Sequence, residues 1–347
     1  MEQLLGIILH SIGGFSSASF YVPYSQVKKW AWSTYWITLG FVAWMVMPTI
    51  GGWLVSSDLY GILKSTSFSS KLWTYVFGVL WGFGGLMAGL GLRYLGLSLG
   101  QSISLGVCAI FGTLVPAYLT DKLGILVTTV PGMVILLGFI LTIAGIALCG
   151  YAGVLKDRRL TGEEKEQSVK EFSAVKGITM AVLGGIMSSF MALAINAGAP
   201  IATEAANTGT AAVFVNIPIF VLALAGGFTT NFIYSMILSY KNRSFGDFGV
   251  KPPSVRSRNY LLAVLSGVMW YGQYFFYGMG ATKMGDYDFA SWSLHMATII
   301  IFSNLWGLRL NEWKLVDRKT MACLWSGIMM LIVSVIVIGI GNHLAGG

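Results

Sequence analysis

Charged residues are scarce in this chain of 347 residues. Asp, Glu, Lys and Arg together make up 10% of it, whereas soluble domains usually carry about 25%. Hydrophobic residues account for 55%, and the mean hydropathy is +0.72. So few charges leave too little polar surface to keep the chain in water. The composition therefore excludes an ordinary soluble domain and predicts an all-α integral membrane protein.

Cysteine and the common catalytic motifs are also rare or missing. Cys108, Cys149 and Cys323 lie far apart in apolar runs, without a C-x-x-C pair, which argues against a disulfide framework and a zinc site. The sequence has no nucleotide-binding G-x-x-x-x-G-K-[ST], no H-E-x-x-H and no G-x-S-x-G. We therefore predict no metal, no cofactor and no catalytic residue, and transport driven by a gradient or by exchange rather than by ATP.

Apolar stretches of about 20 residues are long enough to cross a bilayer as helices. Ten stretches qualify. They are 4–24, 32–55, 73–92, 97–119, 130–152, 177–197, 213–240, 260–281, 289–308 and 320–341. Glu2 stands where a signal peptide would carry basic residues, so we expect the first stretch to remain as a membrane helix.

Basic residues predict the orientation of these helices. With ten spans, 18 of the 22 Lys and Arg residues fall on the face opposite the termini. Basic loops stay in the cytoplasm, so both termini should lie outside. The net charge of +8 then needs no nucleic acid, because such loops sit well against anionic membrane lipids.

The sequence also repeats itself in two registers. In the first register, which aligns Gly78 with Gly267, six aligned pairs are identical: Gly78/Gly267, Val79/Val268, Trp81/Trp270, Gly89/Gly278, Gly91/Gly280 and Gly96/Gly285. In the second, which aligns Gly6 with Gly177, Gly6-Ile7, Gly13-Gly14 and Ser17 match Gly177-Ile178, Gly184-Gly185 and Ser188. Five helices per repeat is an odd number, so the second copy should be inverted, as in many secondary transporters. We predict a first five-helix repeat over 1–152, a cytoplasmic linker over 153–176 and a second repeat over 177–347.

Two stripes of aromatic and polar residues are candidate binding surfaces. Trp270, Gln273, Tyr274 and Tyr277 share one helix face, and Asp288, Ser291, Trp292 and His295 share another. Aromatic rings stack on sugar C–H faces while amides and phenols bind hydroxyls, so these stripes and Trp81 suit a small polyol. The alternatives are an aromatic packing seam for the first stripe and a helix-end cap for Asp288.

Ionisable groups at membrane depth are costly and mark candidate proton carriers. His10 lies in the first stretch and His295 in the ninth, and imidazole titrates near neutral pH. Glu204 lies among small residues in a segment that lengthens the second repeat, where a desolvated carboxylate would also hold a proton. The candidates are Glu204, Asp288, His10 and His295. A hydrogen-bonded structural histidine and a solvated loop glutamate stay open as alternatives.

Several strings of the sequence resemble the L-rhamnose/proton symporter family, which belongs to the drug/metabolite transporter superfamily. They are His10-x-Ile12-Gly13, Phe20-Tyr21-x-Pro23, Val27-Lys28-Lys29-Trp30-x-Trp32, Trp81-Gly82, Arg93-Tyr94-Leu95-Gly96-x-Ser98-x-Gly100, Glu204-Ala205-Ala206, Met269-Trp270-Tyr271-x-Gln273-x-Phe275-Phe276-Tyr277, Tyr287-Asp288-x-x-Ser291-Trp292-x-Leu294-His295-Met296 and Glu312-Trp313. The resemblance implies uptake of L-rhamnose, a 6-deoxy sugar, with protons across the bacterial inner membrane. Ser33 stands near where the family carries an acidic residue, so no role of that acid is transferred.

The working hypothesis is alternating access by two repeats around a central sugar site. Two other functions stay open. One is an exporter of drugs or metabolites from the same superfamily, and the other is a membrane receptor that binds without translocation. The oligomeric state is left open.

Overall fold

The computed structural model describes residues 2–95, 97–157, 173–311, 313–314 and 316–345, and this part of the chain forms helices and no strand. The long segments are α1 (Glu2–Ser19), α2 (Trp32–Phe41), α3 (Met47–Val55), α5 (Phe68–Leu95), α6 (Leu97–Leu119), α8 (Val130–Asp157), α10 (Ala174–Ala197), α12 (Ile219–Lys241), α13 (Pro253–Ala281), α14 (Ala290–Arg309) and α15 (Arg318–Ala345). The short ones are η1 (Val22–Gln26), η2 (Val42–Val46), α4 (Leu59–Ser65), α7 (Leu123–Thr128), α11 (Ala199–Asn207), η3 (Ala212–Phe214), η4 (Ser244–Gly249) and η5 (Gly285–Tyr287).

Each predicted apolar stretch overlaps one of these long helices, except that α2, η2 and α3 follow one another over 32–55. By length and composition, seven helices among the described residues can cross a membrane, and α6, α13 and α14 are not among them. Polar residues such as Gln273 and His295 lower the hydropathy of α13 and α14. The membrane class is therefore confirmed.

The structure corrects the prediction around 199–218. The stretch 213–240 starts too early, because α12 begins only at Ile219, directly after Pro218. The preceding residues form η3 and turns. The segment with Glu204 is a helix, α11, rather than a loop.

Part of the predicted linker 153–176 continues the helices on either side of it. Residues 153–157 belong to α8, and α10 begins at Ala174. Residues 158–172 lie outside the described residues, as do Gly96 and Glu312 of the family strings.

Helix α1 shows why lipid is the solvent. Apart from Glu2, its exposed residues are large and apolar, for example Leu4, Ile8, Ile12 and Phe15. Apart from Leu9, its buried residues are small or polar and include Gly6, His10, Gly13, Gly14 and Ser17. A soluble helix has the opposite arrangement, so the outer face of α1 is built to meet hydrocarbon.

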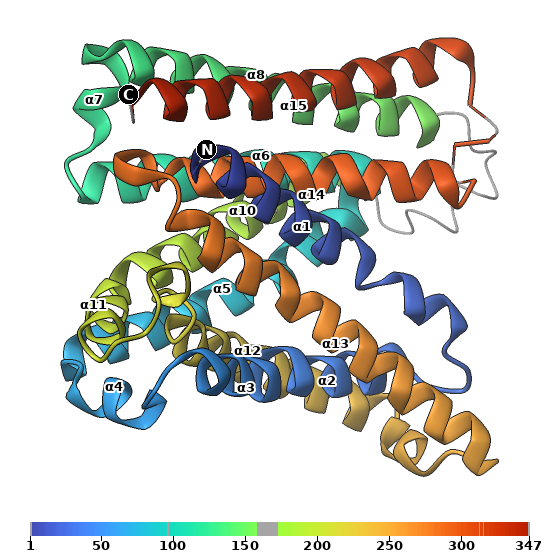
Figure 1. Ribbon diagram of the computed structural model, residues 1–347. Helices are drawn as coiled ribbons and strands as arrows, with labels where there is room; N and C mark the ends of the chain where they lie inside the picture. The colour runs from blue at the N-terminus through green and yellow to red at the C-terminus, as the bar shows by residue number, and fades with distance from the viewer. Residues whose placement is uncertain (1, 96, 158–172, 312, 315, 346–347) are drawn as a thin grey trace.

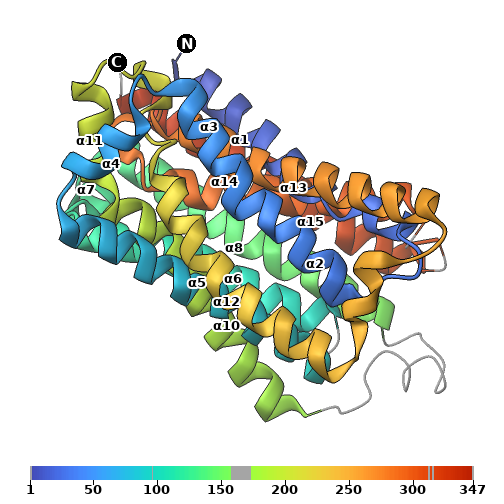
Figure 2. The same cartoon turned by 90° about the horizontal axis from the view of Figure 1, so that it is seen from below.

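The helices form an elongated bundle in which both termini lie at the same end, together with α4, α7 and α11 (Figures 1 and 2). Helices α8 and α15 run antiparallel as a pair along one side. Helix α1 packs on α13 and α14, while α10 packs on α5 and α6. Helix α12 lies against α2 and α5. Segment η4 lies at the end opposite the termini (Figure 2).

A π turn interrupts the second membrane segment. In η2 the N–H of Met47 bonds to the carbonyl of Val42, five residues back. Pro48 follows in α3 and has no N–H to give to the preceding turn. The wide turn directs Trp44 into the bundle, where its side chain is 1% exposed.

The end opposite the termini is fastened by Asp247 of η4. Its Oδ2 accepts hydrogen bonds from the Ala31 N–H at 2.6 Å and the Thr34 hydroxyl at 3.0 Å. Its carbonyl accepts the Trp30 indole N–H at 2.6 Å. Ala31 has no side chain that can cap α2, so Asp247 supplies that cap from a distant segment and favours the positive end of the helix dipole.

We expect Gly78→Ala to destabilise the protein. A Cβ at Gly78 in α5 would lie 2.0 Å from the backbone carbonyl oxygen of Ala223 in α12. Backbone cannot move aside cheaply, so the overpacking should cost about 1–3 kcal/mol. Thermal unfolding in detergent would show this as a lower melting temperature.

The matched control is Gly85→Ala in the same helix, where a Cβ meets nothing within 4 Å. Alanine favours helix over glycine, so this variant should keep or raise the melting temperature. Equal melting temperatures for the two variants would contradict the close packing of α5 on α12.

Candidate functional site

Two histidines meet at the centre of the bundle. His10 of α1 and His295 of α14 are both 0% exposed, and their ring centroids are 6.1 Å apart. Tyr277 of α13 lies against both, at 5.2 Å from the His10 ring and 5.3 Å from the His295 ring. Glycine makes room for them, since a Cβ at Gly280 would lie 2.9 Å from Nε2 of His10. The two predicted histidines are therefore brought together by three different helices.

The hydrogen bonding of the two imidazoles is incomplete within the described part of the chain. Nδ1 and Nε2 of both rings are buried without a hydrogen-bond partner among the described residues. A buried polar atom without a partner costs about 1–3 kcal/mol, and native structures rarely keep one without a role. The arrangement fits a site that takes up a proton, a water molecule or a ligand group.

The tryptophans form a second cluster next to the histidines. The ring centroids of Trp81 in α5 and Trp270 in α13 are 5.8 Å apart. The Trp44 ring lies against both, with centroid distances of 6.2 Å to Trp81 and 5.3 Å to Trp270. Tyr274 lies 5.3 Å from Trp270. The predicted stripe Trp270, Gln273, Tyr274 and Tyr277 is buried throughout, and Gln273 donates to the Trp270 carbonyl at 3.0 Å. Because these rings contact one another, the packing seam of the sequence analysis describes Trp81, Trp270 and Tyr274 well.

A cavity of about 160 Å³ lies beside the histidines, where α6, α10, α11, α12, α13 and the start of α14 meet. Three of the predicted site residues line it: Tyr277, Asp288 and Trp292. The remaining lining residues are Gly112, Pro116, Thr120, Ala192, Ile195, Asn196, Ala199, Ala202, Asn216, Ile219, Ala281 and Phe289. Trp81, Trp270, Gln273, Tyr274 and Ser291 are not among them, although the Ser291 hydroxyl is buried without a partner in the described structure.

The α6 wall of the cavity depends on a glycine and a proline. A Cβ at Gly112 would lie 2.2 Å from Nε1 of Trp292, so only glycine lets the indole lie against α6. The indole N–H donates to the Cys108 carbonyl at 3.2 Å. Pro116 lies inside α6 and has no N–H for the Gly112 carbonyl. That carbonyl therefore lacks its usual α-helical donor.

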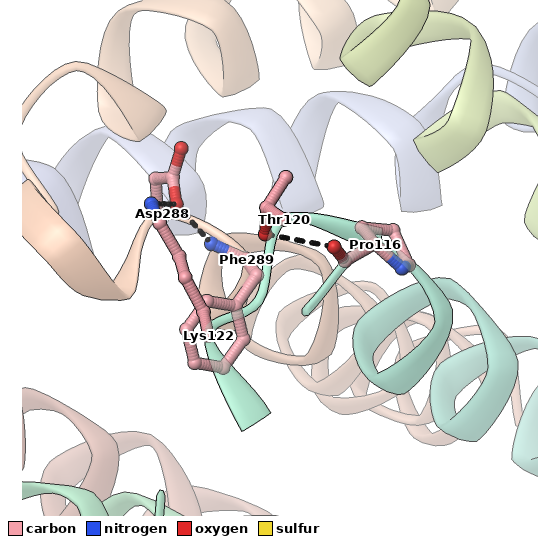
Figure 3. A network of polar contacts seen from close by, with 5 residues as sticks. All are labelled: Pro116, Thr120, Lys122, Asp288 and Phe289. Carbon is pink, nitrogen blue, oxygen red and sulfur yellow. Dashed lines mark hydrogen bonds and ion pairs between the residues drawn. The ribbon is translucent and has the colours of Figure 1, made fainter. Parts of the chain in front are cut away.

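The mouth of the cavity carries an ion pair (Figure 3). Lys122 Nζ lies 2.8 Å from Asp288 Oδ1, and the two side chains are 29% and 55% exposed. The same oxygen accepts the Phe289 N–H at 2.9 Å, and Thr120 donates to the Pro116 carbonyl at 2.8 Å. Asp288 thus lies one residue before Phe289, the N-cap of α14, at the positive end of that helix dipole, and it also borders the cavity.

Glu204 is separate from the other proton candidates. Its Oε1 accepts a hydrogen bond from the Ser65 hydroxyl of α4 at 3.0 Å, and α4 lies at the end that holds the termini (Figure 1). Its helix α11 reaches the cavity through Ala199 and Ala202 rather than through Glu204.

Sequence reasoning missed two asparagines in the cavity wall. The Asn216 amide donates to the Gly278 carbonyl at 3.1 Å. The Asn196 side chain has no hydrogen-bond partner within the described ranges, and it faces the cavity. Trp44, in the tryptophan cluster, was missed as well. An amide at the end of a long apolar run was the available signal for Asn196, because buried amides also need partners.

Comparisons with known proteins agree with the resemblance. The model of the family described as L-rhamnose-proton symport protein matches residues 2–344. The chain is 37% identical over 342 residues to the "L-rhamnose-proton symporter" of Yersinia pestis (strain Pestoides F), covering 97% of this chain and 98% of the relative. It is also 37% identical over 341 residues to the protein of that name from Cronobacter sakazakii (strain ATCC BAA-894), covering 97% of each chain.

We expect a water-soluble thiol reagent to reach the cavity. Its wall includes the exposed Ala199 and the half-exposed Asp288. In a variant with all three cysteines replaced by alanine, Asn196→Cys should react with a charged methanethiosulfonate. Mass spectrometry of the intact protein would measure the reaction.

The control is Ala194→Cys, two residues earlier in α10. Ala194 is 0% exposed and does not line the cavity, so its thiol should react far more slowly. Equal rates at the two positions would argue against an open cavity.

Proposed function

We propose, from the premise that this chain belongs to the L-rhamnose-proton symport protein family, that it imports L-rhamnose together with protons by alternating access. It is a transporter rather than an enzyme. The observation that carries the proposal is the cavity beside two buried histidines whose ring nitrogens have no hydrogen-bond partner among the residues that the structure describes. The exporter alternative is not favoured, because the relatives matched along 97% of this chain are named symporters.

In this proposal ten helical segments cross the membrane as two inverted five-helix repeats. Glycine contacts support the repeat. A Cβ at Gly6 would meet Lys283 and Met284, and a Cβ at Gly177 would meet Tyr94 and Leu95. The register that aligns Gly78 with Gly267 also aligns Tyr94-Leu95 with Lys283-Met284, while Gly6 and Gly177 are aligned by the other register. The two sequence registers therefore relate the contact at Gly177 to the contact at Gly6, residue by residue.

A second contact follows the same rule. A Cβ at Gly280 would meet His10, and a Cβ at Gly91 would meet Ala181. Gly91 is aligned with Gly280 by the first register, and His10 is aligned with Ala181 by the second. The packing of whole helices follows the same rule, because α1 packs on α13 and α14 while α10 packs on α5 and α6. Inverted repeats let a carrier open to either side by tilting one half against the other.

The protein lies in the bacterial inner membrane in this proposal, with both termini outside. The basic loops support this orientation because they gather at the end away from the termini. There Lys29 donates to the Lys251 carbonyl at 3.2 Å, and Arg258 donates to Gln26 at 2.8 Å. Lys156 lies 4.8 Å from the Trp313 ring centre. Such an end faces the cytoplasm and anionic lipid headgroups.

Of the four proton candidates, the geometry favours His10 and His295. Asp288 is half exposed and paired with Lys122, and Glu204 is bonded to Ser65 away from the cavity. The histidine rings contact Tyr277 of α13, and the Thr298 hydroxyl donates to the backbone carbonyl of His10 at 3.2 Å. Tyr277 also lines the cavity, so it joins the proposed proton site to the proposed sugar site.

Coupling requires that proton binding and sugar binding favour the same conformation of the carrier. A proton on a buried imidazole is unfavourable unless water or a ligand oxygen solvates it. A sugar hydroxyl near Tyr277 would supply such an oxygen, so protonation would strengthen sugar binding. By linkage the sugar would strengthen proton binding equally.

Uptake in proteoliposomes tests the proposed function. With an inward proton gradient, labelled L-rhamnose should accumulate above its external concentration, and a protonophore should reduce it to equilibrium. Uptake that ignores the pH gradient would exclude proton symport. Protection of cells against toxic cations without sugar uptake would instead favour an exporter.

Removing either histidine should uncouple transport. We expect His10→Gln and His295→Gln to abolish accumulation driven by the pH gradient, because glutamine does not titrate, and to retain exchange of L-rhamnose between the two sides. The measurement is accumulation against counterflow in the same vesicles.

The third histidine offers the matched control. His343 is exposed near the end of α15, so His343→Gln should accumulate sugar like the wild type. Glu204→Gln and Asp288→Asn complete the set. Loss of accumulation in a carboxylate variant, with both central histidine variants still coupled, would move the proton site to that carboxylate.

A further inference from the structure

The cavity has an apolar wall that the proposed function does not yet use. Ile195 of α10, Ala202 of α11 and Ile219 of α12 line it. All three belong to one hydrophobic cluster with Ile62, Ile201 and Ala205. Their side chains carry no polar atom, so this part of the cavity cannot satisfy a hydroxyl group.

Hydrogen-bonding groups occupy other parts of the same cavity. Asn196 offers an amide without a partner among the described residues. Tyr277 and Asp288 add a phenol and a carboxylate. The cavity therefore suits a small molecule that carries hydroxyl groups and also has an apolar end.

We infer that the sugar lies in this cavity with its methyl group against Ile195, Ala202 and Ile219 and with a hydroxyl on the Asn196 amide. This inference rests on the proposed function and specifies its binding site. It also moves the specificity-determining residues away from Trp81 and Trp270, whose rings are occupied with each other and do not line the cavity.

The physical reason for selectivity is the cost of an unpaired hydroxyl. L-Mannose differs from L-rhamnose by a hydroxyl on C6, and L-lyxose lacks C6 altogether. Against the apolar wall the extra hydroxyl would lose its water without gaining a partner. A pocket of this kind separates such analogues by about 10- to 100-fold.

The experiment is counterflow of labelled L-rhamnose in proteoliposomes, with unlabelled L-mannose and L-lyxose as competitors and no proton gradient. The wild type should prefer L-rhamnose to both. Ala202→Ser places a hydroxyl on the apolar wall and should reduce the preference over L-mannose about tenfold, because the C6 hydroxyl then has a partner. Ala211→Ser, the same change at an exposed residue outside the cavity, should leave it unchanged.

Asn196→Ala should act differently. It removes a group that contacts the ring hydroxyls, so the half-competing concentrations of all three sugars should rise together, by about five- to tenfold. Asn207→Ala, at the exposed end of α11, is its control. An unchanged affinity for all three sugars would remove Asn196 from the site.

Further outcomes separate the two proposals. Counterflow with wild-type preferences in Ala202→Ser overturns the inference alone, whereas no L-rhamnose counterflow in the wild type overturns the proposed function and the inference with it. If gel filtration shows that Ala202→Ser does not fold, Ile219→Val takes its place. It removes a methyl group from the wall and should lower the preference over L-lyxose a few-fold, and an unchanged preference would overturn the inference.

Discussion

Close contact between helices at glycine is the constraint on which the rest of this structure depends. In lipid the hydrophobic effect does not drive helices together, so they associate through packing where side chains are small. Gly14 lies against Thr298, Gly78 against the Ala223 backbone, and Gly280 against the His10 ring. The contacts at Gly14 and Gly280 fix how near α1 comes to α14 and α13, and hence where His10 meets His295. The position of a titratable group is thus determined by residues that have no side chain.

Much of the fold follows from the sequence because the requirement for crossing a bilayer can be recognised in each segment by itself. A run of about 20 apolar residues is visible without any knowledge of its neighbours, and helices form at all ten such runs. The short helix α11 was missed because it is amphipathic and only nine residues long. The late start of α12 was missed because four of the five residues 213–217 are apolar, and Pro218 marks the boundary.

The site was partly predictable for the same reason. Helical spacing placed Ser291, Trp292 and His295 on one face of α14, and all three are buried, but so is every residue from Ala290 to Thr298. Their partners on other helices could not be read from spacing. Nothing local indicates that Trp44 contacts Trp81 and Trp270, or that Asn196 and Tyr277 line one cavity. Asn196 was also missed because the search for polar groups concentrated on ionisable residues, although an asparagine amide is costly to bury without a partner.

The π turn at Val42–Val46 has a consequence for the length of the chain. It accommodates one residue more than an α-helical turn would. Deleting a single residue there would restore regular α-helical winding and leave the face that α3 presents to the bundle unchanged. Gly51, whose Cβ would lie 2.2 Å from the Tyr271 hydroxyl, would then stay against α13. A deletion in the regular parts of α2 or α3 would instead turn the rest of the helix by about 100°, so the π turn is the place in this segment where the loss of one residue should be tolerated best.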